Sequence, residues 1–270
     1  MRFEGPFEVV DRALAEDIGT GDITSELTVP ADRLARGRFF AKQPLVLAGV
    51  EVLPQIYPTG LTVHHSSGAR LAPGDCVAEV TGNARRLLSC ERTALNFLQR
   101  LSGIATLAAQ FAAEVAHTKC KVLDTRKTIP GLRVLEKMAA AAGGVTNHRL
   151  GLFDAVLIKN NHIAAAGGVA QALAAALPSG LPVEIEVRTR AELDEALAHG
   201  ATRLLLDNLS PAEAREWITY INGRASCEIS GGVTLATVRA YAEAGADFVS
   251  SGAITHSAPA VDLNFRLELL

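Results

Sequence analysis

The segment LDTRKTIPGLRVLEKMAAAAGGVTNHRLGLFDAVLIKNNH, residues 123–162, decides both the fold and the kind of site to look for. Short apolar runs at 120–123 and 155–158 flank a helical pattern at 132–142. The basic side chains of interest in this segment are Arg126, Lys127, Arg133, His148, Arg149 and Lys159. Cations that adjoin buried strands need an anionic partner or water. Because these cations stand at strand ends, we predict a pocket for a small polyanion; the alternative is a solvated basic face.

Apolar runs and helical stretches alternate from residue 119 onward, which predicts a parallel sheet. The apolar runs are 120–123, 155–158, 183–187, 204–206, 227–229 and 248–249. The helical stretches are 132–142, 164–177, 190–199, 211–221 and 235–244. Repeat units of about 20–40 residues favour a (β/α) barrel. An open doubly wound sheet is the alternative, although no Gly-x-Gly-x-x-Gly follows the first strand.

The N-terminal part has a different pattern. The expected elements are a helix at 7–16, a polar turn with a helix cap at 17–24, and strands at 37–42, 61–65 and 76–80. A long helical pattern covers 91–117, and we expect a break near Ser102-Gly103. The Ala-rich stretch 163–183 lacks charge, but Gly167-Gly168 interrupts it. It therefore predicts a buried helix, a turn and a strand rather than a membrane span.

Composition favours a soluble globular enzyme. The 270 residues, 49% apolar and 20% charged, can bury a sizeable core. A net charge of −3 gives no reason to expect nucleic acid or an anionic membrane as a partner. The four cysteines are scattered without a Cys-x-x-Cys pair, and the first residues do not resemble a signal peptide. These features predict a cytoplasmic protein with reduced cysteines.

Polar or glycine residues follow every apolar run of the repeat. They are Asp124-Thr125-Arg126-Lys127, Lys159-Asn160-Asn161-His162, Glu186, Asp207-Asn208, Ser230-Gly231-Gly232 and Ser251-Gly252. In a (β/α) barrel the C-terminal strand ends meet at one rim, where active sites lie. The first two strands bring cations, and Glu186 and Asp207 bring oxygen ligands suited to Mg²⁺. The Ser and Gly turns of the last two strands favour phosphate, because their backbone N–H groups are free.

This rim predicts an enzyme that acts on a Mg²⁺-bound phosphorylated sugar and a small di-acid, although the residues alone do not select the di-acid. Two other classes of function remain open. One is a Schiff-base aldolase with Lys159 as nucleophile. The other is a non-catalytic barrel that binds an anionic metabolite. Glu186 and Asp207 argue against the second, because an anion sensor gains nothing from two carboxylates facing its pocket.

The chain resembles the quinolinate phosphoribosyltransferase family, also called carboxylating nicotinate-nucleotide pyrophosphorylases, nearly from end to end. The matching motifs are Glu16–Thr24, Glu91–Asn96, Leu101–Thr106, Asp124–Thr128, Asn147–Arg149, Ile158–Lys159, Asn161–His162, Glu184–Val187, Leu206–Asn208, Ser230–Gly232 and Gly252–Ser257. A related group linked to molybdenum transport shares Thr125–Thr128. However, Pro130–Arg133, Asn147–Arg149 and Ile158–His162 fit the quinolinate enzymes better.

The resemblance implies a reaction and an assembly. Quinolinate and 5-phosphoribosyl-1-pyrophosphate would give nicotinate mononucleotide, CO₂ and pyrophosphate with Mg²⁺ as cofactor, as a step of de novo NAD biosynthesis. The implied α/β fold is an N-terminal open α/β sandwich domain at 1–112 and an incomplete (β/α) barrel at 113–261, with a tail at about 262–270 that returns to the first domain. Two chains would pair head to tail, so that each closes the other's barrel mouth. Whether such homodimers assemble further stays open.

The resemblance also implies residue roles. The quinolinate carboxylates would be held by Thr125, Arg126, Lys127, His148, Arg149 and Lys159. The ribose hydroxyls and Mg²⁺ would be held by Glu186 and Asp207. The 5-phosphate would be held by Ser230, Gly231, Gly232, Ser251 and Gly252. Arg92 would reach the neighbouring chain's site, and the catalytic set would be Lys127, Arg149, Lys159, Glu186 and Asp207.

Two positions depart from the family pattern. Asn160 stands where an acidic residue is usual, and Ala140–Ala142 replaces a stretch that often carries an Arg. Neither departure removes one of the contacts named above. We therefore expect both to alter affinity at the mouth of the site rather than to abolish activity.

Overall fold

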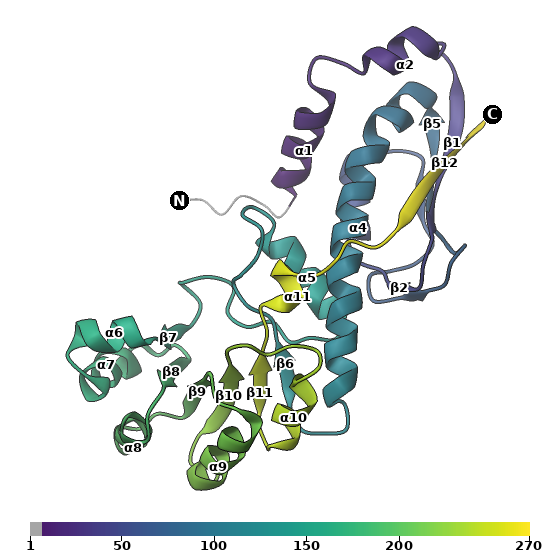
Figure 1. Cartoon of the computed structure of the whole chain (residues 1–270). Coiled ribbons are helices and arrows are strands. Elements are labelled where there is room, and N and C mark those ends of the chain that lie inside the picture. Colours follow the sequence, from purple (N-terminus) through teal and green to yellow (C-terminus); the bar gives the residue numbers. More distant parts are fainter. Residues whose placement is uncertain (1–6) are drawn as a thin grey trace. The chain divides into compact units, whose positions relative to one another are not determined.

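The chain is described by a computed structural model that covers residues 7–270. It forms two compact units, and each is described by itself (Figure 1). The first unit consists of the residues up to 109 together with 128–144 and 257–270. The second unit consists of 110–127 and 145–256. Compact units are not the same as independently folding domains, so the domain limits at 112 and 261 stay a prediction.

The first unit contains an antiparallel sheet and the helices around it. Its elements are α1 (Glu8–Ile18), α2 (Ile23–Thr28), β1 (Leu34–Ala41), β2 (Leu45–Val46), η1 (Val50–Val52), α3 (Leu53–Ile56), β3 (Leu61–Val63), β4 (Arg70–Leu71), β5 (Cys76–Asn83), most of α4 (Ala84–Val115), α5 (Arg133–Ala142) and β12 (Leu263–Leu269). The sheet order is β12–β1–β5–β3. The C-terminal strand β12 pairs with β1, with Phe265 opposite Phe39. Gly37 leaves room for the Phe265 ring, which a Cβ atom would overlap.

Two expectations about the first unit can be compared with its helices. The predicted turn and cap at 17–24 is confirmed, because the Asp22 carboxylate accepts the Ser25 N–H at 3.0 Å and begins α2. The predicted break at Ser102-Gly103 is wrong, because α4 runs through it without interruption. A Cβ at position 103 would overlap the Pro259 carbonyl oxygen, so this glycine permits a close approach instead of ending the helix. A helical Gly costs only about 1 kcal/mol, which tertiary packing offsets.

The second unit contains a six-stranded sheet in which all neighbouring strands are parallel. Its strands are β6 (Lys121–Leu123), β7 (Val156–Ile158), β8 (Val183–Val187), β9 (Arg203–Asp207), β10 (Ser226–Ser230) and β11 (Phe248–Ser250). The strand order is β6–β11–β10–β9–β8–β7. A single parallel bridge joins Thr146 to Leu123 beyond β6. Since β6 and β7 lie at opposite ends of the sheet, the barrel is incomplete, as expected.

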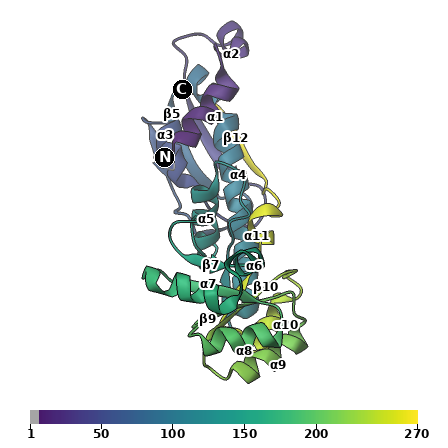
Figure 2. The same cartoon turned by 90° about the vertical axis from the view of Figure 1, so that its left-hand side faces the viewer.

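Helices follow the strands of the second unit in the predicted alternation. They are α6 (Asn160–Ala166), α7 (Val169–Ala176), the 3₁₀ turn η2 (Leu177–Ser179), α8 (Arg190–Ala198), α9 (Pro211–Ile221), α10 (Val238–Glu243) and α11 (Ala253–His256). Figures 1 and 2 show α7 to α10 along the outside of the sheet. Reciprocal capping boxes begin α8 at Thr189 and α9 at Ser210. Local sequence therefore fixes where these helices begin.

The Ala-rich stretch differs from the single buried helix expected there. Gly167 and Gly168 have φ values of 91° and 146°, which L side chains rarely adopt, and they separate α6 from α7. Most residues of α6 are exposed, whereas α7 buries Val169, Ala172 and Leu173. Alanine is a strong helix former on a surface too, so its abundance predicted the helix but not the burial. Among residues 7–270, no helix is long and apolar enough to span a membrane.

Candidate active site

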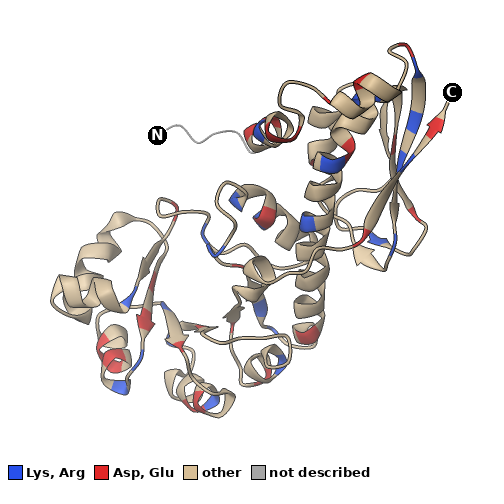
Figure 3. Ribbon diagram, turned by 45° about the horizontal axis from the view of Figure 1, so that its top comes forward, with Lys and Arg blue, Asp and Glu red and all other residues tan. Residues whose placement is uncertain are grey.

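Parallel strand register brings three of the predicted site residues to one edge of the sheet. Glu186 lies near the end of β8, and Asp207 ends the neighbouring strand β9. Asp207 is in register with Ser230, which ends β10. Figure 3 shows acidic positions in red on the strands of this sheet. Because the strands are parallel, residues that end neighbouring strands lie side by side whatever their distance in sequence.

A guanidinium lies between the two carboxylates. The Arg188 Nη2 atom is 2.8 Å from Glu186 Oε1 and 3.7 Å from Asp207 Oδ2. Glu186 is buried, whereas the Arg188 side chain is 48% exposed and can move aside. The position between Glu186 and Asp207 is therefore one where a cation is favourable. The sequence reasoning missed Arg188, although this residue directly follows β8 and the strand-end rule includes it.

Two half-buried guanidiniums, those of Arg126 and Arg149, lie close enough for their charges to interact. Burial lowers the pKa of Arg149, and the charge of Arg126 lowers it further, against the opposing effect of Asp154 and Glu184. The Arg149 Nη1 atom donates to the Ala155 carbonyl at 3.1 Å. Like charges that are held together away from water favour a bound anion. A polyanion pocket formed with these two residues stays a prediction.

The loop after Arg149 is held by one carboxylate. Asp154 accepts the N–H groups of Leu150 at 2.6 Å and Gly151 at 2.9 Å. Burial alone would raise the pKa of Asp154, but these hydrogen bonds outweigh it and lower the pKa. The loop that carries Arg149 is thus closed by its own hydrogen bonds rather than left to solvent.

Lys127 lies against the turn that follows β11. The Thr255 hydroxyl donates to the Lys127 carbonyl at 2.7 Å, and a Cβ on Gly252 would be 2.7 Å from Lys127 Cδ. Two of the predicted hydroxyl groups already have local partners. Thr125 Oγ1 accepts the Lys127 N–H at 3.1 Å, and Ser251 donates to the Val233 carbonyl at 2.8 Å. The hydroxyl of Ser251 is therefore engaged in holding the turn.

The glycine turn after β10 has a backbone that other residues cannot adopt without strain. Gly231 and Gly232 have φ values of 93° and 62°. A Cβ on Gly231 would overlap Asn208, which itself has a φ of 57°. Asn208 donates its N–H to Ser230 O at 2.9 Å and its side-chain amide to Asp207 at 2.7 Å. This turn is consequently fixed to the carboxylate side of the site.

Lys159 directly follows β7 and is held by one long ion pair. Its Nζ atom is 3.9 Å from Glu186 Oε2, and its side chain is 53% exposed. Its N–H donates to His162 Nδ1 at 2.9 Å, which fixes the backbone but leaves the ammonium mobile. Lys159 therefore lies near Glu186 with freedom to reach a ligand.

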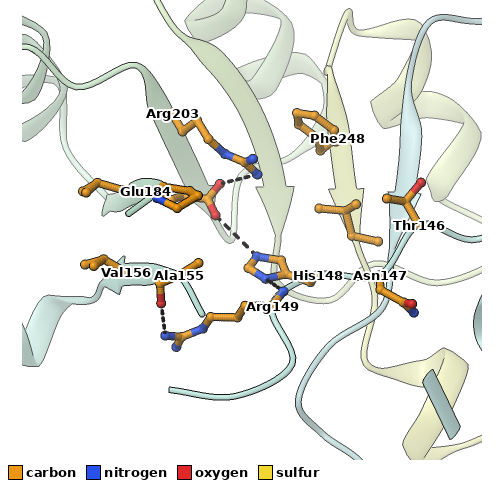
Figure 4. Close-up of a pocket in the computed structure, with 12 residues that line it drawn as sticks. Thr146, Asn147, His148, Arg149, Ala155, Val156, Glu184, Arg203 and Phe248 are labelled. Atoms are coloured by element: carbon orange, nitrogen blue, oxygen red, sulfur yellow. Dashed lines mark hydrogen bonds and ion pairs between the residues drawn. The ribbon is translucent and has the colours of Figure 1, made fainter. Parts of the chain in front are cut away.

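His148 points into the sheet rather than to the strand-end edge. Its Nε2 atom is 3.4 Å from both Glu184 and Glu228, and Arg203 lies 3.8 Å and 3.9 Å from the same two carboxylates. Figure 4 shows the contacts of Glu184 with His148 and with Arg203. His148, Glu184 and Arg203 line a cavity of about 190 Å³. Glu184 and Glu228 are 4% and 1% exposed. We name His148, Glu184, Glu228 and Arg203 the inner cluster.

Burial and neighbouring charges shift the pKa values of His148 and Glu184 in the inner cluster. Burial opposes charging His148, but the two carboxylates outweigh it and raise its pKa to about 9. Burial raises the pKa of Glu184. His148 Nδ1 accepts the Arg149 N–H at 2.7 Å, and the Nε2 atom faces the two carboxylates.

The sequence reasoning missed Glu184, Glu228 and Arg203 as a group. Val183–Val187 reads VEIEV, so the alternation that sends Glu186 to one face sends Glu184 to the same face. Barrel interiors are usually filled by branched apolar residues, and a charge on that face is a signal of function. Alternation along the strand could have identified Glu184. It could not have shown that Glu184 on β8 and Glu228 on β10 face the same histidine.

Two basic residues lie outside the second unit. Arg92 is exposed on the part of α4 that belongs to the first unit. Arg133 begins α5 in the first unit and donates from Nε to Thr128 Oγ1 at 3.1 Å. The other predicted site residues all belong to the second unit. A role for Arg92 beside them stays a prediction.

Comparisons with known proteins agree with this arrangement. The N-terminal domain of quinolinate phosphoribosyl transferase matches residues 22–102, and the C-terminal domain matches residues 104–266. The chain is 41% identical to a carboxylating nicotinate-nucleotide pyrophosphorylase from Mycobacterium leprae, with 98% of each chain covered. It is 39% identical to a chloroplastic enzyme of the same name from Oryza sativa subsp. japonica, with 96% of this chain and 77% of the relative covered.

Solved structures give the same result. A nicotinate-nucleotide pyrophosphorylase from Francisella tularensis has a TM-score of 0.92 at 38% identity, with 97% of this chain and 96% of that chain covered. The protein of this name from Ehrlichia chaffeensis has a TM-score of 0.93 at 33% identity, with 99% of this chain and 100% of that chain covered. On sequence and fold together, the chain belongs to the quinolinate phosphoribosyltransferase family.

Proposed function

We propose that this protein transfers the phosphoribosyl group of 5-phosphoribosyl-1-pyrophosphate to quinolinate and then releases CO₂, giving nicotinate mononucleotide for NAD synthesis. One observation carries the choice of a di-acid. Arg126 and Arg149 hold two mutually repelling cations in a half-buried place, a short distance along the chain from the exposed Lys127 and Lys159. A substrate with two adjacent carboxylates offsets that repulsion, and a substrate with one does not.

The transfer step needs positioned charge rather than a nucleophilic side chain. The ring nitrogen of quinolinate attacks C1 of the ribose, and the bond from C1 to the pyrophosphate oxygen breaks. The transition state resembles an oxocarbenium ion, so holding both substrates in line is the main contribution of the protein. In this proposal Arg126, Arg149 and Lys159 hold quinolinate. The turns at 230–232 and 251–252 hold the 5-phosphate.

The decarboxylation step follows from the product of the first. The ring nitrogen is now cationic, and the carboxylate on the neighbouring carbon leaves as CO₂. The electron pair of the broken bond stays on that carbon and is then protonated. Arg149 and Lys127 contribute by holding the carboxylates so that the one beside the nitrogen lies free of the strongest contacts.

The carboxylate pair fits a magnesium ion, which we propose as the cofactor. Glu186 and Asp207 offer hard oxygen donors, and the side chain of Arg188 between them is 48% exposed and can move aside for a bound cation. When bound, Mg²⁺ would orient the pyrophosphate and neutralise part of its charge. The ribose hydroxyls would hydrogen-bond to the same two carboxylates.

We further propose a homodimer in which Arg92 of one chain serves the site of the other. Arg92 is exposed on α4, and the other proposed contacts belong to the second unit. A dimer that places each first unit over the other chain's second unit would complete both sites by symmetry. The cytosolic location stays a prediction from the sequence.

The experiment is an assay of the purified protein with quinolinate, phosphoribosyl pyrophosphate and Mg²⁺. Nicotinate mononucleotide and CO₂ should form together, and a chelator should stop both until Mg²⁺ or Mn²⁺ is restored. Nicotinic acid lacks one carboxylate and therefore offsets less of the repulsion between Arg126 and Arg149, so its specificity constant should be at least about 100-fold lower. Equal rates with quinolinate and nicotinic acid would refute the assignment.

A further inference from the structure

The segment that carries Arg149 is held from beneath by buried carboxylates. Asp124, fully buried after β6, accepts the His148 N–H at 2.8 Å and the Asn147 side-chain amide at 2.6 Å. His148 Nδ1 accepts the Arg149 N–H at 2.7 Å. The imidazole therefore connects the backbone of Arg149, through Nδ1, to the groups that contact its Nε2 atom.

The far side of the ring is held by Glu184 and Glu228. These residues come from β8 and β10, on either side of β9, and both lie 3.4 Å from His148 Nε2. In Figure 4 the ring stands between Glu184 and Arg149, with dashed lines on both sides. If the His148 imidazole were flipped about its Cβ–Cγ bond, carbon atoms would face the carboxylates and the hydrogen bond from the Arg149 N–H would be lost. The two carboxylates therefore select one orientation of the imidazole.

Stability alone does not account for this cluster. Within residues 7–270, Glu184 Oε1 and both carboxylate oxygens of Glu228 are buried without a hydrogen bond. The contacts with Arg203, at 3.8 Å and 3.9 Å, are too long for hydrogen bonds. Buried charges with such partners cost stability compared with apolar residues of the same size. We therefore look for their role in the support that they give to the Asn147–Arg149 segment above them.

A metal ion is the other reading of one histidine and two carboxylates, whose ligand atoms lie within 4.8 Å of one another. Arg203 argues against it. Its guanidinium faces both carboxylates and stacks over Phe248, 5.0 Å from the ring centroid, so a resident cation already balances the cluster. We therefore infer that the positive charge beside Glu184 and Glu228 is that of Arg203 and not that of a metal ion.

We propose that Glu184 and Glu228 are positioning residues that orient the His148 ring and, through its Nδ1 atom, fix the backbone of Arg149 for binding a quinolinate carboxylate. The inference rests on the proposed function for the identity of the ligand. It also changes the expected role of His148. In place of a contact with quinolinate, His148 acts through Arg149.

The first test measures kinetics in Glu184→Gln and Glu228→Gln. Each change keeps the shape and removes the charge. The KM for quinolinate should rise about tenfold, as when one hydrogen bond that positions a ligand group is lost, with the KM for phosphoribosyl pyrophosphate within twofold of the parent. Asp247→Asn is the matched control. Asp247 accepts the Cys227 N–H at 2.9 Å in the same sheet and does not contact the inner cluster, so its variant should leave both KM values unchanged.

The second test uses two variants of His148. An Asn places its oxygen near the position of Nδ1 and keeps an acceptor for the Arg149 N–H, whereas a Gln places its polar atoms near Nε2. His148→Asn should therefore stay closer to the parent KM for quinolinate than His148→Gln. The reverse order would show that His148 contacts the substrate through Nε2 and would overturn the proposal.

A third measurement does not depend on the reaction. Amide hydrogen exchange of the peptide that contains Arg149 should speed up in Glu184→Gln and Glu228→Gln, and not in Asp247→Asn. If the parent lacks quinolinate activity, the proposed function fails, and this exchange still decides whether the carboxylates hold Arg149. Unchanged exchange at Arg149 overturns the proposal. The proposal is also overturned if the parent protein binds one equivalent of a divalent metal and both Gln variants fail to bind it.

Discussion

Replacing Arg149 by Lys tests the anion pocket most directly. Arg149 is half-buried, donates Nη1 to the Ala155 carbonyl at 3.1 Å, and lies close enough to Arg126 for their charges to interact. Its planar fork can keep the Ala155 contact and still offer N–H groups to a carboxylate. A Lys keeps the charge, but its single nitrogen cannot reach both partners with the same geometry. We expect the loss of one charge-assisted hydrogen bond.

Such a bond contributes about 1.5–3 kcal/mol, so kcat/KM for quinolinate should fall about 10- to 150-fold. The assay is the initial rate of nicotinate mononucleotide formation at limiting quinolinate and saturating phosphoribosyl pyrophosphate. Arg224→Lys is the matched control. Arg224 also donates to backbone carbonyls, at 3.0 Å to Ile221 and 2.8 Å to Tyr220, but at the end of α9. If Arg149→Lys keeps kcat/KM within threefold of the parent, Arg149 is only a surface cation and the reasoning is wrong.

Three further predictions concern other residues. Borohydride added during turnover should trap no adduct on Lys159, because the reaction needs a fixed charge there; a trapped adduct would favour the aldolase class. Arg92→Ala and Lys127→Ala should each be nearly inactive, and a co-expressed mixture should recover about a quarter of parental activity, because about half the dimers are hybrids with one intact site of two; no recovery despite hybrids confirmed by two affinity tags would rule out a shared site. Cys120 and Cys227 should resist iodoacetamide at pH 8 in the folded protein, because burial raises the pKa of both thiols to about 12, and should react once it is unfolded; equal labelling in both states would contradict the described burial.

The sequence by itself determined the second unit's order of elements and most of its strand-end residues. An apolar run followed by a polar residue and then a helical period is a local pattern, set by backbone hydrogen bonding and by the spacing of buried side chains. Each of the six predicted runs overlaps a strand. Parallel strands bring their ends to one edge, so Glu186, Asp207 and Ser230 could be placed together before any coordinates were known.

The sequence was less informative where a residue type has two uses. Gly103 indicated a helix break, but it allows α4 to pass close to Pro259. Alanines at 164–176 indicated one buried helix, but the stretch forms a largely exposed helix, α6, and a half-buried one, α7. In both cases the residue is small, and a small side chain is consistent with a break, with a close approach or with a surface. Only the neighbours in space distinguish these possibilities.

Tertiary structure alone decided which buried charges meet. Glu184, Arg203 and Glu228 lie about twenty residues apart along the chain and come from three different strands, and His148 comes from a loop. Strand alternation gives the face on which each side chain lies, but the curvature of the sheet determines whether β8 and β10 bring theirs to one histidine. Curvature depends on the packing of the whole unit. Local sequence therefore specified the charged residues, and long-range packing made them a cluster that holds Arg149.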